Sequence, residues 1–398
     1  MQINLAVFFG CSSVEHEVSI ISAVQAMHSL NREKYNVIPV YVTKDGVTVT
    51  GKALFDIKEY KDLPALLKKV KPVSFAREEG GVMMRPTGAR FMQKAQRIDV
   101  ALPIVHGTNC EDGTVQGLFE FLRLPYVGCD IISSAVGMDK AVFKDVLAAA
   151  GLPVLPCIRF YSREYFQQRE EILDRIENEI GLPAIVKPAN LGSSVGITKA
   201  SDRAALADAI DLACSFADKV LVERAVTQLR EINCSVLGDY DECISSVCEE
   251  PIMHDDILSF EDKYLGGGKK SGGSKGMTSL SRRLPAEISD EKSEEIRTLS
   301  CKIFKAIGCT GIARIDFIMD TGDNNKVYAN EINTIPGSLA FYLWEATGIN
   351  YPQLLDRAVD SALRRQRKRE SLNFTFSSNI LSGVGDLSGS KGAKGAKF

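Results

Sequence analysis

The stretch from Ile312 to Leu343 constrains what this chain can fold into more than any other. Two runs rich in β-branched and apolar residues, 312–319 and 326–332, flank Thr-Gly-Asp-Asn-Asn at 321–325, a cluster of turn-forming residues. Such a pattern predicts a β-hairpin. We expect its turn to be centred between Asp323 and Asn324.

Antiparallel pairing around this turn brings acidic side chains together. It places Asp316 opposite Glu331, and the two-residue period of a strand puts Arg314 and Asn333 on the same face. Opposed carboxylates repel each other, whereas a hard cation such as Mg²⁺ prefers oxygen ligands. The hairpin therefore predicts a metal site formed by Asp316, Glu331 and Asn333.

A solvent-facing edge hairpin is the alternative to this metal site, because hydration is the common fate of Asp and Glu side chains. The segment after the second strand argues against it. Asn333 is followed by Thr-Ile-Pro-Gly at 334–337, a tight backbone element that a ligand can approach closely. We therefore favour the metal site.

The composition excludes several classes of protein. The chain has 398 residues, of which 45% are hydrophobic and 25% charged, as in a globular protein of two or three domains. A formal net charge of −3 gives no reason to expect nucleic acid as the main partner, and no apolar run is long enough for a membrane span. Ten cysteines without CxxC pairs, and no N-terminal targeting signal, predict free thiols and a cytoplasmic location.

The N-terminal part has the alternating pattern of a doubly wound α/β fold. Apolar runs at 3–9, 35–42 and 98–105 predict strands of a parallel sheet, in which ligands bind beyond the carboxyl ends. Glu15 and His106 fall at such ends and are site candidates. The alternatives are a helix-start dipole partner for Glu15 and a loop histidine with a satisfied hydrogen bond for His106.

A glycine- and serine-rich loop at 190–196 is the candidate for phosphate binding. It follows Lys187 near the end of one predicted strand and precedes Ile-Thr-Lys at 197–199, which predicts another strand. This order argues against the P-loop and the dinucleotide-binding fingerprint, because both of those loops open a helix. Backbone N–H groups and hydroxyls of such a loop can approach phosphate oxygens, and Lys187 supplies positive charge.

These motifs together resemble a known family. Arg-x-Asp, a turn and Glu-x-Asn-Thr-x-Pro-Gly resemble the metal-binding end of the ATP-grasp ligases, and more narrowly of the D-alanine:D-alanine ligases. HGxxxEDGxxQG from residue 106, PYVG at 125–128, MDK at 138–140 and the serine loop extend the likeness over roughly residues 3–362. The resemblance implies an N-terminal doubly wound (pre-ATP-grasp) α/β domain followed by a two-subdomain α+β ATP-grasp fold.

The expected domains follow from this resemblance. We place the N-terminal α/β substrate-binding domain at 1–121, the central ATP-grasp subdomain with the phosphate loop at 122–218, the C-terminal subdomain with a lid and the metal hairpin at 219–363, and a basic, disordered tail at 364–398. The lid candidate is the glycine- and lysine-rich segment 266–276, whose composition departs from the family's usual lid.

The implied reaction joins two D-alanines to D-alanyl-D-alanine through an acyl phosphate, for peptidoglycan precursor synthesis. ATP is the phosphoryl donor, and two Mg²⁺ or Mn²⁺ ions are the expected cofactors. The resemblance assigns catalysis to Glu15, Ser193, Tyr264, Arg314 and Gly337, substrate binding to His106, Tyr342 and Leu343, ATP binding to Lys140, Lys187, Ser194, Glu223, Glu231 and Lys263, and metal binding to Asp316, Glu331 and Asn333.

Three of these roles are specific enough to state. Tyr264 is expected to bond across the site to Ser193 and Glu15, and Arg314 with the backbone N–H of Gly337 to stabilise the oxyanion. Glu223 and Glu231 are expected to hold the adenine and ribose of ATP. On the residues alone, Lys140 is equally an ordinary helix-start lysine, and the two glutamates are equally solvated acids at a strand edge.

One departure from the family concerns the second substrate. Phe341-Tyr342-Leu343 replaces the His-Ser-Leu run that binds the carboxylate of the second amino acid. Tyr342 can donate a hydrogen bond but is larger than serine, so D-alanine, D-serine and D-lactate stay open.

Two other classes of function also stay open. Another ATP-grasp ligase with a different carboxylate and amine would not need Glu15 or Tyr264, and a non-catalytic nucleotide-binding protein would not need the complete metal set. The expected partners are D-alanine and ATP, and the expected assembly is a homodimer.

Overall fold

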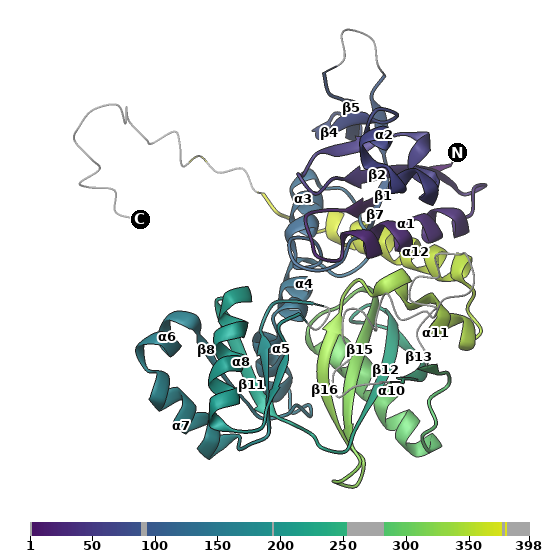
Figure 1. Ribbon diagram of the computed structural model, residues 1–398. Coiled ribbons are helices and arrows are strands. Elements are labelled where there is room, and N and C mark those ends of the chain that lie inside the picture. The colour runs from purple at the N-terminus through teal and green to yellow at the C-terminus, as the bar shows by residue number, and fades with distance from the viewer. Residues whose placement is uncertain (1, 89–93, 193–194, 253–281, 376–378, 380–398) are drawn as a thin grey trace. The chain divides into compact units, whose positions relative to one another are not determined.

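The computed structural model describes residues 2–88, 94–192, 195–252, 282–375 and 379 (Figure 1). Four residues predicted for the site lie outside this part of the chain: Ser193, Ser194, Lys263 and Tyr264. The whole predicted lid at 266–276 and most of the predicted tail also lie outside it. Residues 364–370, predicted to begin the disordered tail, are helical instead. The chain divides into two compact units, residues 1–363 and 364–398. The first unit contains three β-sheets.

The first sheet has the strand order β6-β5-β4-β3-β2-β1-β7. One end of this sheet is parallel, as the apolar runs predicted: β1 (Ile3–Gly10) pairs with β2 (Tyr35–Val42) and with β7 (Val100–Ile104). Antiparallel strands, which the sequence analysis did not identify, extend it beyond β2: β3 (Thr48–Thr50), β4 (Lys71–Glu78), β5 (Gly81–Pro86) and β6 (Gln96–Ile98). The predicted parallel sheet is therefore one end of a mixed sheet.

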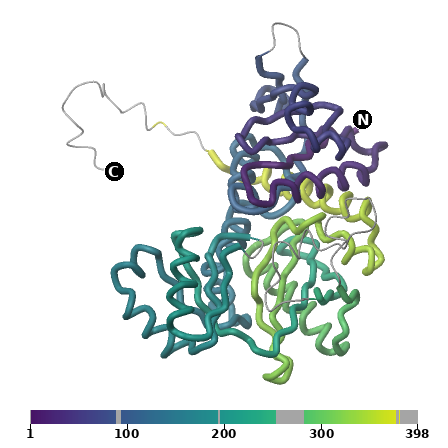
Figure 2. The backbone as a smooth tube through the Cα atoms, in the orientation of Figure 1, coloured from purple at the N-terminus to yellow at the C-terminus, as the bar shows by residue number. Residues whose placement is uncertain are grey.

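Helices cover both faces of this sheet, which explains why β1 is apolar throughout. On one face Val7 and Phe9 belong to the same apolar cluster as residues of α1 (His16–Ser29) and α12 (Tyr351–Glu370), so both helices contribute to that core (Figures 1 and 2). On the other face Phe8 packs against Phe119 of α3 (Thr114–Leu122). The remaining short elements are η1 (Lys52–Phe55), η2 (Ile57–Lys61), α2 (Leu63–Leu67) and α4 (Ile131–Met138).

The second sheet has the order β10-β9-β11-β8 and carries the phosphate-loop candidate. Its β9 (Ala184–Pro188) and β10 (Thr198–Ala200) pair antiparallel on either side of the loop, so the predicted order of strand, loop and strand is confirmed. The other strands are β8 (Cys157–Tyr161) and β11 (Lys219–Arg224), and the helices are α5 (Lys140–Ala149), α6 (Ser162–Gln167), α7 (Arg169–Glu179) and α8 (Arg203–Phe216).

The third sheet has the order β14-β13-β12-β15-β16 and contains the predicted hairpin. One of its faces is apolar and packs against α10 and α5, with Ile315 and Phe317 in that core. The elements are β12 (Leu229–Gly238), β13 (Cys243–Pro251), β14 (Arg282–Arg283), β15 (Gly311–Asp320), β16 (Lys326–Asn333), α10 (Asp290–Ala306), η4 (Gly337–Ala340) and α11 (Phe341–Ala346).

The hairpin has the predicted register near the site and a β-bulge farther out. Asp316 pairs with Glu331, and Arg314 with Asn333, but Phe317 pairs with Ala329, so Asn330 is the extra residue. The bulge lets Ala329 and Ile332 both lie in the apolar core, although three positions separate them. As a result Asn330 and Glu331 are both directed away from that core.

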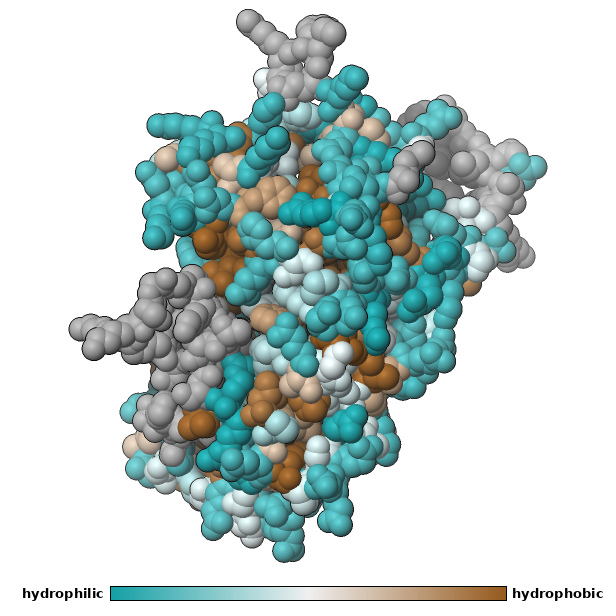
Figure 3. Space-filling view, turned by 90° about the vertical axis from the view of Figure 1, so that its right-hand side faces the viewer, coloured by the Kyte–Doolittle hydropathy of each residue, from teal (hydrophilic) through white to brown (hydrophobic). Residues whose placement is uncertain are grey.

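The surface is of mixed character. On the face shown in Figure 3, hydrophilic residues predominate and hydrophobic ones are interspersed in patches. None of the helices in the described ranges combines the length and the apolar character that a membrane span requires.

Candidate active site

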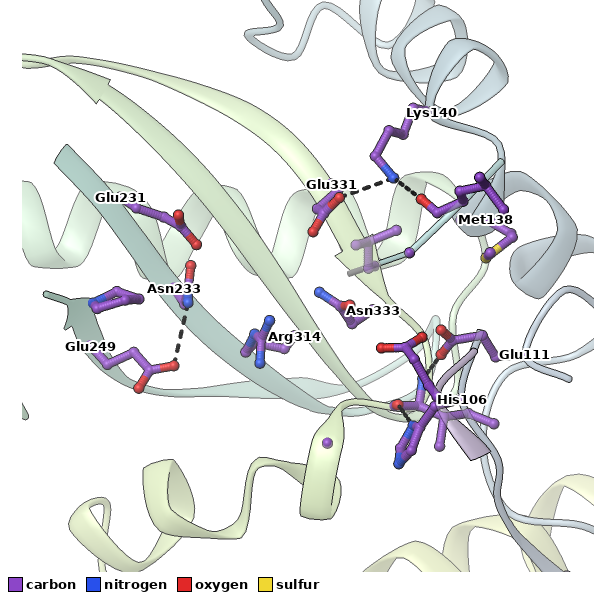
Figure 4. A pocket seen from close by; sticks show the side chains of 18 of the residues that line it. His106, Glu111, Met138, Lys140, Glu231, Asn233, Glu249, Arg314, Glu331 and Asn333 are labelled. Atoms are coloured by element: carbon purple, nitrogen blue, oxygen red, sulfur yellow. Dashed lines mark hydrogen bonds and ion pairs between the residues drawn. The ribbon is translucent and has the colours of Figure 1, made fainter. Parts of the chain in front are cut away.

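A solvent-connected cleft, whose empty space together with adjoining solvent is about 900 Å³, brings most of the predicted site residues together. The loops after β1, β7 and β9 reach it from the first and second sheets, and the polar face of the third sheet forms its floor (Figure 4). Of the described residues predicted from sequence, the following line it: Glu15, His106, Lys140, Glu231, Arg314, Glu331, Asn333, Gly337 and Tyr342.

A row of four polar residues crosses the third sheet. Glu249 on β13 pairs with Asn233 on β12, Asn233 pairs with Asp316 on β15, and Asp316 pairs with Glu331 on β16. Residues opposite each other on neighbouring strands share a face, so the four side chains lie on the face away from the apolar core. Sequence reasoning found only the half of this row that lies within one hairpin.

Arg314 and Asn333 both bond the carboxylate of Asp316 in the middle of this row. Arg314 donates from Nε and a terminal nitrogen to the two carboxylate oxygens of Asp316, each over 2.7 Å, and Asn333 donates to the same carboxylate over 3.0 Å. Burial alone would lower the pKa of the Arg314 guanidinium, but the Asp316 charge outweighs it and raises that pKa well above its ordinary value. The arginine is therefore a permanent cation inside the cleft.

Lys140 lies at one end of the row. Its Nζ is 3.1 Å from a carboxylate oxygen of Glu331 and donates over 2.8 Å to the carbonyl oxygen of Leu191, in the phosphate-loop candidate (Figure 4). The Lys140 side chain is only 8% exposed, so it is more than an ordinary helix-start lysine on the surface. It connects the glycine-rich loop to the acidic hairpin.

Lys187 and Glu223 form a buried ion-pair cluster instead of lining the cleft. The Glu223 carboxylate contacts Lys187 Nζ through one oxygen and Lys144 Nζ through the other, the latter over 2.7 Å, and Lys187 also donates to Asn330 over 3.0 Å. Burial tends to raise the pKa of Glu223, but the two lysine charges outweigh it and lower the pKa to about 2. The alternative interpretation, a solvated acid at a strand edge, is therefore wrong for Glu223, which is 1% exposed.

Lys144 was missed by sequence reasoning, although a signal for it exists. It is four residues after Lys140 on α5, a spacing that puts both side chains on one face of a helix.

Glu15 reaches the cleft from the start of α1. A Cβ atom added to Gly107 or to Gly192 would come within 2.9 Å of its Oε2, so the carboxylate lies against both glycines. A side chain at either position would force the Glu15 carboxylate to shift. The Glu15 carboxylate thus lies between the loop after β7, at Gly107, and the phosphate-loop candidate, at Gly192.

His106 is fixed through both ring nitrogens. Its Nδ1–H donates to the carbonyl oxygen of Ile335 over 2.9 Å, and its Nε2 accepts from the Ser22 hydroxyl over 3.2 Å. Burial lowers the pKa of the imidazole, which agrees with a neutral ring. Both interpretations of His106 therefore hold. Its hydrogen bonds are satisfied, and it also lines the cleft.

Glu111 was quoted as part of a motif but not predicted as a site residue. It accepts hydrogen bonds from the backbone N–H groups of Gly107, over 3.1 Å, and Ile335, over 3.3 Å. Burial, followed by the negative charge of Glu15, raises the pKa of Glu111 to about 8. This glutamic acid positions the backbone that leads to Gly337.

Three consecutive residues after Gly337 adopt the left-handed conformation. Ser338, Leu339 and Ala340 have φ angles of 50°, 53° and 49°. Each such residue costs roughly 1–2 kcal/mol relative to right-handed backbone. Strain of this kind is found where surrounding contacts impose it, and here the Ser338 N–H donates to Ser22 over 3.0 Å.

Tyr342 and Leu343, both predicted to bind substrate, have different environments. Tyr342 lines the cleft, and its hydroxyl donates to Glu249 over 2.8 Å. Leu343 is fully buried in an apolar cluster with Ala340 and is not among the residues that line the cleft.

The predicted metal ligands fit a hard cation. Two carboxylates and one amide oxygen on a single sheet face are the donor types that Mg²⁺ and Mn²⁺ bind. In the described residues no three His, Cys, Asp or Glu side chains form a candidate metal cluster, and this set has only two such residues because its third member is Asn333. Arg314 and Lys140 hold the two carboxylates in place.

Comparison with known families identifies the family of this chain. The family model of the D-ala D-ala ligase N-terminus matches residues 4–129, and that of the D-ala D-ala ligase C-terminus matches residues 146–360. The chain belongs to the D-Ala–D-Ala ligase family. This membership confirms the predicted enzyme class, an ATP-dependent ligase.

Curated relatives of this family align with almost the whole chain. The D-alanine–D-alanine ligase of Thermosipho melanesiensis is 39% identical over 381 residues, which cover 95% of this chain and 98% of the relative. That of Caldicellulosiruptor bescii is 39% identical over 382 residues, covering 94% and 99%.

Solved structures of D-Ala–D-Ala ligases share the fold. The ligase from Coxiella burnetii superposes with a TM-score of 0.76 at 29% identity, covering 93% of this chain and 96% of that one. The VanG D-Ala:D-Ser ligase from Enterococcus faecalis gives a TM-score of 0.75 at 28% identity, covering 91% and 100%. The predicted fold class, an N-terminal α/β domain followed by an ATP-grasp fold, is thereby confirmed.

Proposed function

We propose that this chain joins two molecules of D-alanine to D-alanyl-D-alanine, with conversion of ATP to ADP and phosphate. One observation carries the proposal. Glu331 and Arg314 line the cleft that Glu15 enters from the first sheet, and Asp316, buried beside them, pairs with Glu331 across the hairpin and bonds Arg314. A metal-ligand set, an oxyanion donor and an anchor for an ammonium group are what this reaction needs in one place.

The first step makes an acyl phosphate. A carboxylate oxygen of one D-alanine attacks the γ-phosphorus of ATP, the bond to the β–γ bridging oxygen breaks, and ADP leaves. We assign the ammonium group of this D-alanine to Glu15, because a buried carboxylate is a suitable partner for it. We assign the phosphates to Lys140, Lys187 and the loop at 190–196, and adenosine to the region of Glu223 and Glu231.

The second step forms the peptide bond. The amine nitrogen of the second D-alanine, having lost a proton, attacks the acyl carbon, and the tetrahedral intermediate then expels phosphate. Its oxyanion is assigned to Arg314 and the backbone N–H of Gly337. One such donor is typically worth ~3 kcal/mol of barrier lowering.

The residues that would hold two Mg²⁺ or Mn²⁺ ions are Asp316, Glu331 and Asn333. Bound metal ions would offset the charge that develops on the phosphates. The role of the chain's own groups is to fix the direction of these oxygen atoms, since Arg314 and Asn333 both bond Asp316.

The fold does not separate D-alanine from D-serine as the second substrate, because a D-Ala:D-Ser ligase superposes as well as a D-alanine–D-alanine ligase does. Sequence identity favours D-alanine, since the relatives at 39% identity are D-alanine–D-alanine ligases and the D-Ala:D-Ser ligase is 28% identical. We further propose that the enzyme acts in the cytoplasm, as a homodimer, in peptidoglycan precursor synthesis.

The test is ADP release by the purified protein with ATP and Mg²⁺. D-Alanine alone is compared with L-alanine and with D-alanine plus D-serine or D-lactate, and the product is identified by mass. Formation of D-alanyl-D-alanine from D-alanine alone supports the proposal. Tight ATP binding without ADP release from any D-amino acid would contradict the substrate assignment.

A further inference from the structure

Three side chains form a closed cluster at the end of the polar row opposite Lys140. The Arg282 guanidinium lies 3.9 Å from the ring centroid of Tyr342 and donates to one oxygen of Glu249 over 2.8 Å. The other oxygen of Glu249 accepts from the Tyr342 hydroxyl over 2.8 Å. All three side chains line the cleft, and those of Arg282 and Glu249 are only 11% and 3% exposed.

The Tyr342 hydroxyl donates its hydrogen bond within this cluster. A phenol has one O–H to donate, and in Tyr342 it goes to Glu249. From the sequence, this hydroxyl is expected to take the place of the family's serine as a donor to the second substrate. The structure instead gives Tyr342 the task of holding Arg282, through the face of its ring.

Three cationic side chains line the described part of the cleft, and each contacts a different carboxylate of the polar row. They are Lys140, Arg282 and Arg314. Lys140 contacts Glu331 and the phosphate-loop candidate, and Arg314 binds both oxygens of Asp316. Figure 4 shows Lys140 with Glu331 at one end, Glu249 with Asn233 at the other, and Arg314 between them.

We propose that Arg282 binds the α-carboxylate of the second amino acid, and that Tyr342 and Glu249 are its positioning residues. This inference rests on the function proposed above. A guanidinium presents donors in a planar fork that matches a carboxylate, and stacking on Tyr342 fixes the plane of that fork. With the acyl carbon held near Arg314, an amino acid whose amine faces Arg314 has its carboxylate free to extend towards Arg282.

The experiment is a competition between two acceptors for the same acyl phosphate. D-Alanine and D-alaninamide are supplied together, and the ratio of D-alanyl-D-alanine to D-alanyl-D-alaninamide is measured by mass. D-Alaninamide has no carboxylate, so it can serve only as the second substrate. Comparing each variant with the unmodified protein cancels the difference in basicity between the two amines.

We expect Arg282→Gln to lower this product ratio by about 10- to 100-fold, because a hydrogen-bonded charge contact is lost only for D-alanine. Arg282→Lys keeps the charge but loses the fork and gives an intermediate ratio. Tyr342→Phe keeps the stacked ring and changes the ratio less than about threefold. A direct role of the hydroxyl in carboxylate binding would instead lower it as strongly as Arg282→Gln does.

Arg283→Gln is the matched control. Arg283 is the next residue on β14, so its side chain is directed to the other face, where it pairs with Glu250 and Glu287. Its ratio should equal that of the unmodified protein. An unchanged ratio in Arg282→Gln, or in Arg282→Lys if the glutamine variant does not fold, overturns the proposal for Arg282. Absence of both products from the unmodified protein would overturn the proposed function instead.

Discussion

Glu111 accepts a hydrogen bond from the backbone N–H of Ile335, 3.3 Å away, although the two residues are 224 positions apart in the chain. The Thr334 hydroxyl also donates to the carbonyl oxygen of Glu111, and His106 donates to that of Ile335. These contacts join the loop after β7 to the segment that leads from the β15–β16 hairpin to Gly337. The geometry of the candidate site therefore depends on a carboxyl group that belongs to neither hairpin strand.

Glu111 should make stability fall as the pH rises above about 4.5. Its pKa is raised to about 8 in the folded protein, whereas an unperturbed glutamate titrates at 4.5. The folded state therefore keeps a proton that the unfolded state releases, and this stabilisation is complete below pH 4.5 and lost as the pH approaches 8. The loss amounts to about 1.4 kcal/mol per pH unit within that window.

Urea unfolding at pH 5, 6.5 and 8 measures this effect, with Glu111→Gln as the neutral counterpart. The variant should show a smaller fall in the free energy of unfolding over this range. Equal pH dependence in both proteins would show that Glu111 is ionised in the folded state.

Replacing Glu223 should destabilise the protein strongly. Glu223→Gln leaves Lys144 and Lys187 buried without their counter-charge, a change that typically costs 3–5 kcal/mol or about a third of a typical domain's stability. Because the pKa of Glu223 is lowered to about 2, its contribution is present above pH 4.5 and lost between pH 4.5 and 2. Denaturant unfolding at pH 7 and at pH 4 checks both the size and the sign.

The double variant Lys144→Met with Glu223→Gln tests whether the unpaired lysine charges cause this loss of stability. It removes one of the two unpaired charges, so it should recover part of the lost stability. A double variant as unstable as the sum of the two single ones would show that the three groups act independently.

The hairpin acid Glu331 should be needed for turnover more than for folding. Glu331→Gln removes one proposed metal ligand and the ion pair to Lys140, so we expect kcat to fall by roughly 100-fold or more. The measurement is ADP release at increasing Mg²⁺ concentration. Asp323→Asn, in the exposed turn of the same hairpin, is the control and should leave both kcat and the Mg²⁺ dependence unchanged.

A single methyl group at Gly192 should impair the binding of the first D-alanine. In Gly192→Ala the new Cβ would lie 2.9 Å from Oε2 of Glu15, so the carboxylate must move. We expect kcat/KM for the first D-alanine to fall by about tenfold, as for the loss of one charge-assisted hydrogen bond. Gly117→Ala on α3, where no atom lies within 4 Å of the added Cβ, should keep full activity and be stabilised by up to about 1 kcal/mol. Similar activity losses in both variants would contradict the proposed contact between Gly192 and Glu15.

The sequence predicted what depends on local pairing. The opposition of Asp316 and Glu331 follows from one turn and the two-residue period of a strand, and the structure has that register. The parallel end of the first sheet was predictable because strands buried on both faces form near-continuous apolar runs. β4 was not, since most of its side chains are exposed and its sequence therefore lacks such a run.

The rest of the site could not be predicted because its contacts are distant in sequence. Tyr342 and Glu249 are 93 positions apart, and Lys187 and Asn330 are 143 apart. No spacing rule connects such residues, and only the order of strands in the third sheet places Glu249 in the same row as Asp316. Arg282 has no signal of its own, because an arginine beside a second arginine on a short strand is typical of a solvated surface.

The bulge at Asn330 sets where this chain can change length. It allows Val327 and Ala329 to face the apolar core while Glu331 and Asn333 face the cleft. Deleting one residue there would restore the strict two-residue alternation of β16. Either Val327 and Ala329 would then face away from the apolar core, or Glu331 and Asn333 would face away from the cleft. Insertions in the turn at 321–325 carry no such penalty. Relatives with this chemistry should therefore vary in length at the tip of the hairpin and keep the number of residues between Lys326 and Asn333.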